Sequence, residues 1–246
     1  MPKFVELWVY LSATPLFGLT ATLVVYVLAQ AIYQSLGFAP WANPVMWSVL
    51  VLGGGLLLTG VPYPTYFAGA QFIHFLLGPA VVALAWPLWL RKAELKQRWA
   101  RLLLAAVAGG TAASGSAVLM AWGFGLPPEV IVALAPKSVT APVAMGIADK
   151  LGGIAALAAV FAVLTGLIGA VAGKYLFDAL RTPRTASGWA VRGFALGTAA
   201  HGIGAARALQ VHPDAGAYAA LALGLQVVLA TLLMPLLLPG LLRLLL

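Results

Sequence analysis

Three stretches of this chain place glycine, proline and basic residues in sequence that is otherwise apolar enough to lie in lipid. They are residues 66–88, 136–145 and 199–208. In hydrocarbon an unpaired backbone group costs several kcal/mol, so a break in a helix is tolerated only where it is buried in protein or lines a cavity. We therefore expect the functional site at these three stretches.

Three side chains of the last two stretches can carry positive charge: Lys137, His201 and Arg207. A cation at membrane depth costs ~2.5 kcal/mol or more, so it normally faces a cavity, pairs with an acid or marks a ligand path. The aspartates that follow in the chain all lie near predicted helix ends: Asp149, Asp178 and Asp214. The centre of the membrane is therefore short of acids, and a site that is positive without its ligand suits an anion.

Residues 136–140, Pro-Lys-Ser-Val-Thr, are typical of a helix start. Free N–H groups and the positive end of the helix dipole attract a carboxylate at such a position. Ser138 and Thr140 can add hydroxyl donors. Together with Lys137, these residues form the first part of the predicted site.

Each basic residue also has an ordinary structural explanation. Lys137 and Arg207 can extend to opposite interfaces of the membrane, with only their stems in the apolar region. A single histidine on an apolar helix is usually a packing residue, which is the interpretation we prefer for His74. For His201, which stands in a glycine-rich break, a packing role and a role in ligand binding or proton transfer are both open.

The composition defines the class of protein. The 246 residues are 63% hydrophobic and 8% charged, with a mean hydropathy of +1.01, which predicts an all-α, polytopic membrane protein. The net charge of +8 then indicates cytoplasmic loops and anionic lipid headgroups rather than nucleic acid. Zero cysteines, three scattered histidines and no clustered acids predict no metal site and no enzyme.

The hydropathy pattern predicts seven spans within a single membrane domain covering residues 1–246, at about 20 apolar residues per crossing. A short interfacial helix near Phe4–Ser12 precedes them. The segment 129–151 is interrupted by prolines and a lysine, and we expect it to be re-entrant. The predicted spans lie near 15–36, 44–60, 66–90, 99–123, 153–177, 188–210 and 216–240.

The distribution of basic residues supports the re-entrant segment. The loop at 91–101 carries five Lys or Arg residues and should be cytoplasmic. A re-entrant 129–151 also places Lys174, Arg181 and Arg184 on the cytoplasmic side, together with Arg243. A spanning 129–151 would place the first three outside.

Under this topology two triplets of spans, in 44–123 and 153–240, run in opposite directions. This inverted 3+3 repeat is expected of a secondary transporter. The middle span of each triplet is broken, at Leu-Gly-Pro in 77–79 and at His-Gly-Ile-Gly in 201–204. Gly78 lowers helix propensity and Pro79 removes a donor. Glycine in membrane helices usually means close packing, but the symmetry of the two breaks favours a site.

Three motifs in this order resemble the LrgB/CidB family: residues 64–70 (PTYFAGA) with 75–80 (FLLGPA), 136–145 (PKSVTAPVAM) and 200–208 (AHGIGAARA). The resemblance covers nearly the whole chain from about Pro15. It implies a multi-pass protein of the bacterial inner membrane, described as holin- or antiholin-like, which modulates murein hydrolase export and cell lysis, often with a smaller LrgA/CidA-type partner. The family also includes a plastid glycolate/glycerate translocator, and bacterial members are linked to pyruvate uptake.

The resemblance extends the predicted substrate site to eleven residues. They are Lys137, Ser138, Thr140, His201, Gly202, Gly204, Arg207, Thr65, Tyr66, Gly78 and Pro79. Three hydroxyl groups of the family pattern are missing, because this chain has Ala141, Ala200 and Ala205 at those positions. The exact substrate of a relative therefore does not transfer to this chain.

Three functions are weighed. The first, which we favour, is an alternating-access carrier of small monocarboxylates of the glycolate, glycerate, lactate or pyruvate kind, coupled to a proton on His201 or to sodium. The second is a holin- or antiholin-like pore or scaffold in cell lysis. The third, an intramembrane enzyme, lacks catalytic residues. The expected partners are a small anion, membrane lipid, the LrgA/CidA-type protein and further copies of the chain, such as a dimer.

Overall fold

The computed structural model is helical and describes residues 15–76, 79, 82–83, 86, 89 and 92–245. The predicted interfacial helix near Phe4–Ser12 lies outside the described residues. Its contacts divide the chain into two compact units, Met1–Ala83 and Leu84–Leu246, and the single membrane domain stays a prediction. Each unit is described by itself below.

Four helices within the described residues are long and apolar enough to cross a membrane. They are Leu16–Ser35, Lys96–Gly123, Ala155–Ala179 and Pro213–Leu245, and Pro44–Thr59 is a shorter apolar helix. These helices make the chain a multi-pass membrane protein. The predicted span 66–90 lies partly outside the described residues.

The first unit contains α2 (Pro15–Ser35), the short 3-10 helix η1 (Pro40–Ala42), α3 (Pro44–Thr59) and α4 (Tyr63–Phe75). Asn43 starts α3 by accepting hydrogen bonds from the backbone N–H groups of Val45 and Met46. Gly60, at φ 67°, ends the helix in the left-handed conformation that glycine adopts without strain. Helix α2 packs on both α3 and α4.

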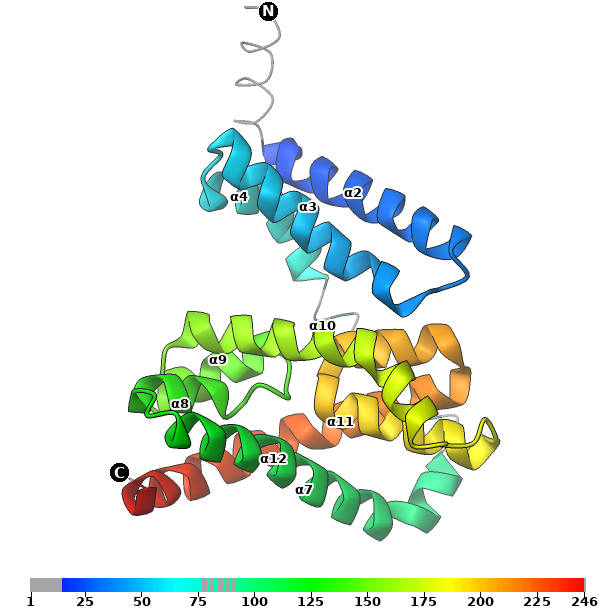
Figure 1. Cartoon of the computed structure of the whole chain (residues 1–246), viewed down its shortest axis with the longest axis vertical. Helices are drawn as coiled ribbons and strands as arrows, with labels where there is room; N and C mark the ends of the chain where they lie inside the picture. Colours follow the sequence, from blue (N-terminus) through cyan, green and yellow to red (C-terminus); the bar gives the residue numbers. More distant parts are fainter. Residues whose placement is uncertain are drawn as a thin grey trace, which may run out of the picture. The chain divides into compact units, whose positions relative to one another are not determined.

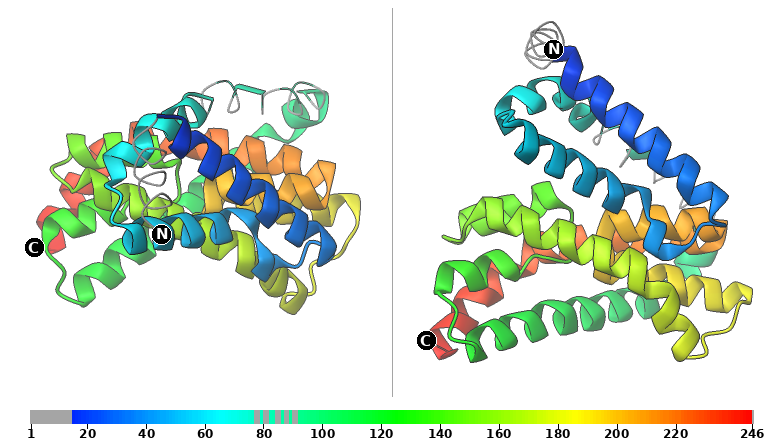
Figure 2. Two further views of the ribbon diagram at one scale, coloured as in Figure 1. Left: turned by 90° about the horizontal axis from the view of Figure 1, so that it is seen from above. Right: turned by 45° about the horizontal axis from the view of Figure 1, so that its top comes forward.

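The second unit contains α7 (Lys92–Gly123), α8 (Pro128–Leu134), α9 (Ala141–Lys150), α10 (Ala155–Ala179), α11 (Ala186–Val211) and α12 (Pro213–Leu245), as Figure 1 shows. Helices α7 and α12 run in the same direction. The Gln226 side chain donates to the Ala106 carbonyl (2.6 Å), and further along Trp122 donates to the Leu245 carbonyl (2.7 Å). Figure 2 accordingly shows the end of α12, in red, beside the end of α7, in green.

The segment 129–151 forms two short helices, α8 and α9, joined by a turn at 135–140; we call this unit hairpin 1. At 1.5 Å per residue, helices of 7 and 10 residues are far too short to cross a bilayer. The hydroxyl of Ser114, on α7, donates to the Ala135 carbonyl (2.8 Å), which α8 leaves without a helical partner at its end. This arrangement agrees with the interruption that the sequence predicts.

Helix α11 is sharply broken at Ala200 (φ −116°, ψ 16°) and His201 (φ 39°, ψ −133°). A methyl group on Gly204 would lie 2.8 Å from the carbonyl oxygen of Leu196. In a continuous helix two residues eight positions apart are about 12 Å apart, so the chain turns back on itself at the break. We call this unit hairpin 2, with an outgoing half (186–199) and a return half (202–211).

The neighbours of hairpin 2 show the same reversal. In the outgoing half, Gly193 and Gly197 lie against Ala215 and Ala219 of α12, so this half runs parallel to α12. In the return half, Ala205 and Ala208 pack in one cluster with the same two residues of α12. The prediction of a membrane span over 188–210 is therefore wrong, although the break itself is confirmed. Hydropathy detects the apolar length of a segment but not the reversal of its direction.

The second unit thus has a simple order: α7 crosses, hairpin 1 follows, α10 crosses back, hairpin 2 follows, and α12 crosses last (Figure 1). The two hairpins enter from opposite ends. Because hairpin 2 returns to its own end, α12 carries Arg243 to the end opposite Lys174 and Arg184, which differs from the predicted placement of Arg243. The predicted inverted repeat of three spans each is not seen within this unit.

Candidate functional site

The tips of both hairpins reach the same part of α10. Val139, in the turn of hairpin 1, packs in a cluster with Ala158 and Ala162 of α10. The Nε2 atom of His201, at the tip of hairpin 2, lies 2.6 Å from the carbonyl oxygen of Ala162. A carbonyl only accepts, so Nε2 is the donor. The structure therefore brings the second and third sequence motifs together on α10.

Helix α7 places the two tips at neighbouring levels. Ser114 holds the turn of hairpin 1, and Gly109 lies against the side chain of Thr198, just before the break in hairpin 2. Five residues of α-helix correspond to about 7.5 Å along the axis. The two contacts with α7 are thus about 7.5 Å apart along its axis.

At the tip of hairpin 1, Lys137 is half-buried and Ser138 is 4% exposed. The Lys137 Nζ atom lies 3.5 Å from the Ser138 hydroxyl, at the outer limit of a hydrogen bond. The predicted helix start at 136–140 is displaced, because α9 begins at Ala141 and Thr140 is its N-cap. The Thr140 hydroxyl makes no capping bond.

At the tip of hairpin 2, His201 is 4% exposed, and its ring lies directly over Gly166 of α10. Gly204 is needed for the close approach to Leu196, which is a structural role. Gly202 differs from Gly204, because a Cβ atom added there would meet nothing within 4 Å. The two glycines therefore have different roles: Gly204 permits close packing, and Gly202 borders open space.

Two further buried polar residues belong to hairpin 2. Arg207, on the return half, is 6% exposed and interacts with other groups of the protein, so it is not the isolated cation that the sequence suggested. Thr198, also 6% exposed, has a hydroxyl with no hydrogen-bond partner. Thr198 is not among the residues predicted from the sequence, since a single threonine in an apolar helix carries no distinctive signal.

A cavity of about 330 Å³ lies beside hairpin 1, between α7 and α12. Ser138 is the predicted site residue on its wall, and Gly110, Ser114 and Gln226 contribute further polar or small positions. Lys137 and His201 do not line it. The expectation that these two residues share one cavity therefore stays a prediction.

The remaining predicted residues belong to the first unit. The Tyr66 hydroxyl lies 2.6 Å from the Thr22 hydroxyl, which joins α4 to α2. Thr65 is half-buried in the first turn of α4, and Pro79 is exposed. Gly78 and the side chain of His74 lie outside what the structure describes.

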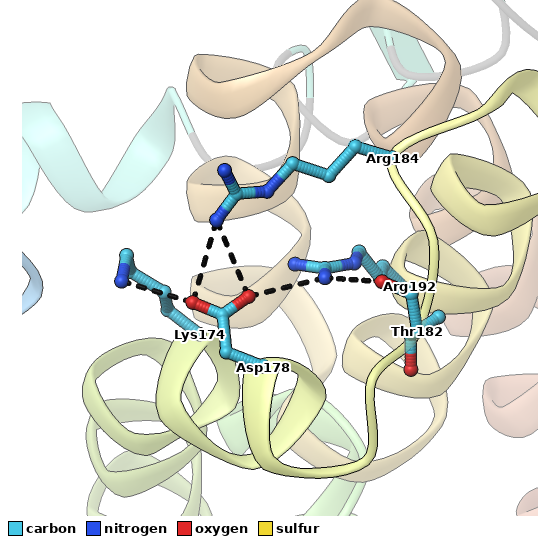
Figure 3. Close-up of polar contacts among 5 residues, drawn as sticks. All are labelled: Lys174, Asp178, Thr182, Arg184 and Arg192. Carbon is cyan, nitrogen blue, oxygen red and sulfur yellow. Dashed lines mark hydrogen bonds and ion pairs between the residues drawn. The ribbon is translucent and has the colours of Figure 1, made fainter.

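One charged cluster was not singled out in the sequence. The Asp178 carboxylate, at the end of α10, contacts Lys174, Arg184 and Arg192 at 3.0, 3.3 and 3.1 Å (Figure 3). The Lys174–Asp178 pair has the (i, i+4) spacing that a sequence can reveal. The contact with Arg192 depends on the packing of α11 against α10.

Among the residues that the structure describes, no group of three or more acidic, histidine or cysteine side chains is arranged to hold a metal ion. The site consists instead of interrupted helices with hydroxyl, imidazole and ammonium groups at their tips. This fold and site define a class: multi-pass helical membrane proteins whose helices are interrupted at the site.

The chain belongs to the LrgB-like family, which it matches over residues 22–239. It is 35% identical over 199 residues to "Uncharacterized protein YwbG" of Bacillus subtilis, covering 81% of this chain and 86% of that protein. It is 32% identical to "Holin-like protein CidB" of Staphylococcus aureus strain N315, and this match covers 88% of the chain and 92% of that protein. It is also 31% identical to "Holin-like protein CidB" of Staphylococcus epidermidis, and this match covers 93% of the chain and 96% of that protein. No solved structure matches the chain.

Proposed function

We propose that this protein carries small monocarboxylates, of the glycolate, glycerate, lactate or pyruvate kind, across the bacterial inner membrane by alternating access. The observation that carries the proposal is the pair of opposed hairpins: Val139 of the first packs in one cluster with Ala158 and Ala162 of α10, and His201 of the second donates to the Ala162 carbonyl. Discontinuous helices that meet inside a membrane domain are typical of transporter sites. Each hairpin could open toward its own side of the membrane while the other stays closed.

In this proposal the anion lies between the two tips. Lys137 supplies the positive charge, Ser138 and Thr140 supply hydroxyl donors, and the open space beside Gly202 receives the carbon chain. Arg207 is buried behind the tip, where it supports the return half. A bound anion would pair with Lys137 and so offset the cost of placing this cation in the membrane.

The sequence is compatible with coupling to a proton or to sodium, and we propose sodium because of the groups at the tip of hairpin 2. The Nε2 atom of His201 already donates to the Ala162 carbonyl. The break at residues 200–201 disturbs the helical pairing of nearby carbonyl groups, and the buried Thr198 hydroxyl has no partner. Carbonyl and hydroxyl oxygens are the groups that coordinate sodium in broken transporter helices.

A holin-like role is the second candidate, and the comparisons favour it over the carrier. Relatives named "Holin-like protein CidB" match about nine-tenths of this chain. Such a role would make the protein a pore or scaffold that modulates murein hydrolase export and lysis, with the smaller LrgA/CidA-type partner and further copies of the chain. A wide pore needs a polar face along its helices, whereas the described lengths of α10 and α12 carry no polar stripe.

Uptake into proteoliposomes separates the two candidates. We expect saturable uptake of labelled lactate or glycolate, counterflow, and competition among short monocarboxylates. Lys137→Ala should lose uptake while remaining folded, because removal of a membrane cation relieves a desolvation cost. Lys150→Ala, which removes an exposed lysine from the same hairpin, is the matched control and should keep uptake.

A different result would support the holin-like role. The carrier would be rejected if the purified protein leaked neutral dyes in proportion to their gradient and size, without saturation and without dependence on Lys137. Equal monocarboxylate uptake by the wild type and Lys137→Ala would remove this residue from the mechanism.

A further inference from the structure

Three cations share one carboxylate at the end of α10, where α10 turns into α11 (Figure 3). Asp178 contacts Lys174 through Oδ2, Arg192 through Oδ1, and Arg184 through both oxygens. One negative charge cannot neutralise three positive ones. The cluster therefore keeps a surplus of positive charge.

The three cations differ in how far they are buried. The Arg192 side chain is only 8% exposed; it also donates to the Thr182 carbonyl (2.6 Å) and lies beside the rings of Phe177 and Trp189. Arg192 therefore fixes the position of Asp178. The side chains of Lys174 and Arg184 are 47% and 62% exposed.

The exposed cations keep unused donors. Lysine has three N–H donors and arginine has five. The Asp178 carboxylate engages one nitrogen of each residue, and the remaining donors of Lys174 and Arg184 are available to an outside acceptor. Two such cations held by a common carboxylate suit a phosphate group, which has several acceptor oxygens.

The cluster lies at the depth of the lipid headgroups. Lys174 and Asp178 stand in the last turns of the candidate span Ala155–Ala179. Tyr175, which is 52% exposed, and Trp189 lie close by, as aromatic residues do at membrane interfaces. The same end of the unit holds the basic start of α7, and the positive-inside rule makes this end cytoplasmic.

We propose that Lys174 and Arg184 bind the phosphate group of an anionic phospholipid of the cytoplasmic leaflet. Arg192 and Asp178 are positioning residues: Arg192 holds Asp178, and Asp178 orients the two exposed cations while competing with the phosphate for them. Another acid at this end, Asp214 at the start of α12, is engaged in interactions of its own.

A lipid fits this site better than a free phosphate ion. The two cations are exposed and form a shallow site, which would hold a dissolved ion only weakly. A lipid headgroup is confined to the plane of the membrane, so its effective concentration beside the cluster is high without a deep pocket. The anionic lipids of the cytoplasmic leaflet also add a general attraction for basic groups.

The test follows the thermal unfolding of the purified full chain in detergent with added phosphatidylglycerol, phosphatidylcholine or glycerol phosphate. Phosphatidylglycerol should stabilise the wild type more than phosphatidylcholine does, and high salt should reduce this effect. The double variant Lys174→Ala/Arg184→Ala should need at least about tenfold more phosphatidylglycerol for the same stabilisation, since each basic residue near an anionic membrane contributes about fivefold. The matched control is Arg181→Gln, an exposed arginine of the same loop outside the cluster. It removes only the general attraction of one basic residue, about fivefold or less, so it should change the response clearly less than the double variant does.

Asp178→Asn gives a prediction of opposite sign. Removal of the competing carboxylate should tighten phosphatidylglycerol binding, because the donors of Lys174 and Arg184 that engage Asp178 become available to the phosphate. Equal stabilisation by the two lipids, an unchanged response of the double variant, or an equal loss in Arg181→Gln would overturn the proposal. Equal stabilisation by glycerol phosphate would assign the site to a free anion instead. If Asp178→Asn does not fold, the double variant and its arginine control still decide.

Discussion

His201 has a backbone conformation, φ 39°, that residues with a side chain rarely adopt. Such a conformation costs about 1–3 kcal/mol and persists only where the surrounding structure fixes it. Here the ring compensates by its hydrogen bond to Ala162, and the ring fits because Gly166 has no side chain. One residue therefore both forms the break in hairpin 2 and attaches the hairpin to α10.

Gly202 provides a direct test of the space next to this break. We expect Gly202→Leu to reduce monocarboxylate uptake at least about tenfold, because the new side chain would occupy space that the substrate needs. The variant should fold, since a Cβ atom at this position meets no atom within 4 Å and leucine exceeds glycine in helix propensity by up to ~1 kcal/mol. The measurement is lactate or glycolate uptake into proteoliposomes beside the thermal unfolding midpoint.

The matched control is Gly224→Leu on α12, which is exposed and also has open space around it. It should keep normal uptake. Equal uptake by the wild type and Gly202→Leu would show that the space beside Gly202 is not used by the substrate.

Helices as short as α8 and α9 are not stable by themselves, since isolated helices below about 12 residues are marginal in water. Hairpin 1 depends on its contacts with longer helices. Ala133, Val139 and Ala144 pack against α10 and Ala230 of α12. The Ser114 hydroxyl satisfies the Ala135 carbonyl at the end of α8. The elements of the site are thus held by α7, α10 and α12 rather than by their own hydrogen bonds.

Ser114→Ala should destabilise hairpin 1. The change leaves the buried Ala135 carbonyl without this donor, at a cost of about 1–3 kcal/mol. We expect a lower thermal unfolding midpoint and faster amide hydrogen exchange at residues 134–140. Ser116→Ala, which removes an exposed hydroxyl bonded only within its own helix, should have little effect on either. Equal exchange in the two variants would contradict the role of Ser114.

In the second unit the long helices alternate in direction along the chain, with a hairpin between each pair. Three crossing helices alternate with two hairpins that enter from opposite ends, and this order places the basic start of α7 and the basic end of α10 at the same end of the unit. The positive-inside rule predicts that this end faces the cytoplasm. The hairpins, in contrast, bring polar groups to the middle without an additional crossing.

Cysteine labelling can test this topology, because the chain has no native cysteine. Val211→Cys and Arg181→Cys, both at exposed positions, should react with an impermeant reagent from the same side of the membrane. Glu129→Cys, exposed at the start of α8, should react from the opposite side. If Val211→Cys reacts from the side of Glu129→Cys, α11 crosses the membrane and hairpin 2 does not exist.

The sequence by itself determined the class, the long apolar helices and two of the helix breaks. Apolar length gives the crossing segments, because the thickness of the bilayer fixes how many residues a span needs. Proline and glycine disrupt helix hydrogen bonding locally, so the interruptions at 136–142 and at His201 were visible without any knowledge of packing. The family also followed from short motifs around these same breaks.

Only the tertiary structure decided the direction of α11 and the groups that meet at its tip. Whether a broken helix continues or turns back depends on contacts between residues far apart in sequence, such as Gly197 with Ala219 and His201 with Ala162. Such contacts leave no periodic signal in either segment. The same holds for the convergence of Val139 and His201 on α10, and for the contact of Arg192 with Asp178, because each depends on how one helix packs against another.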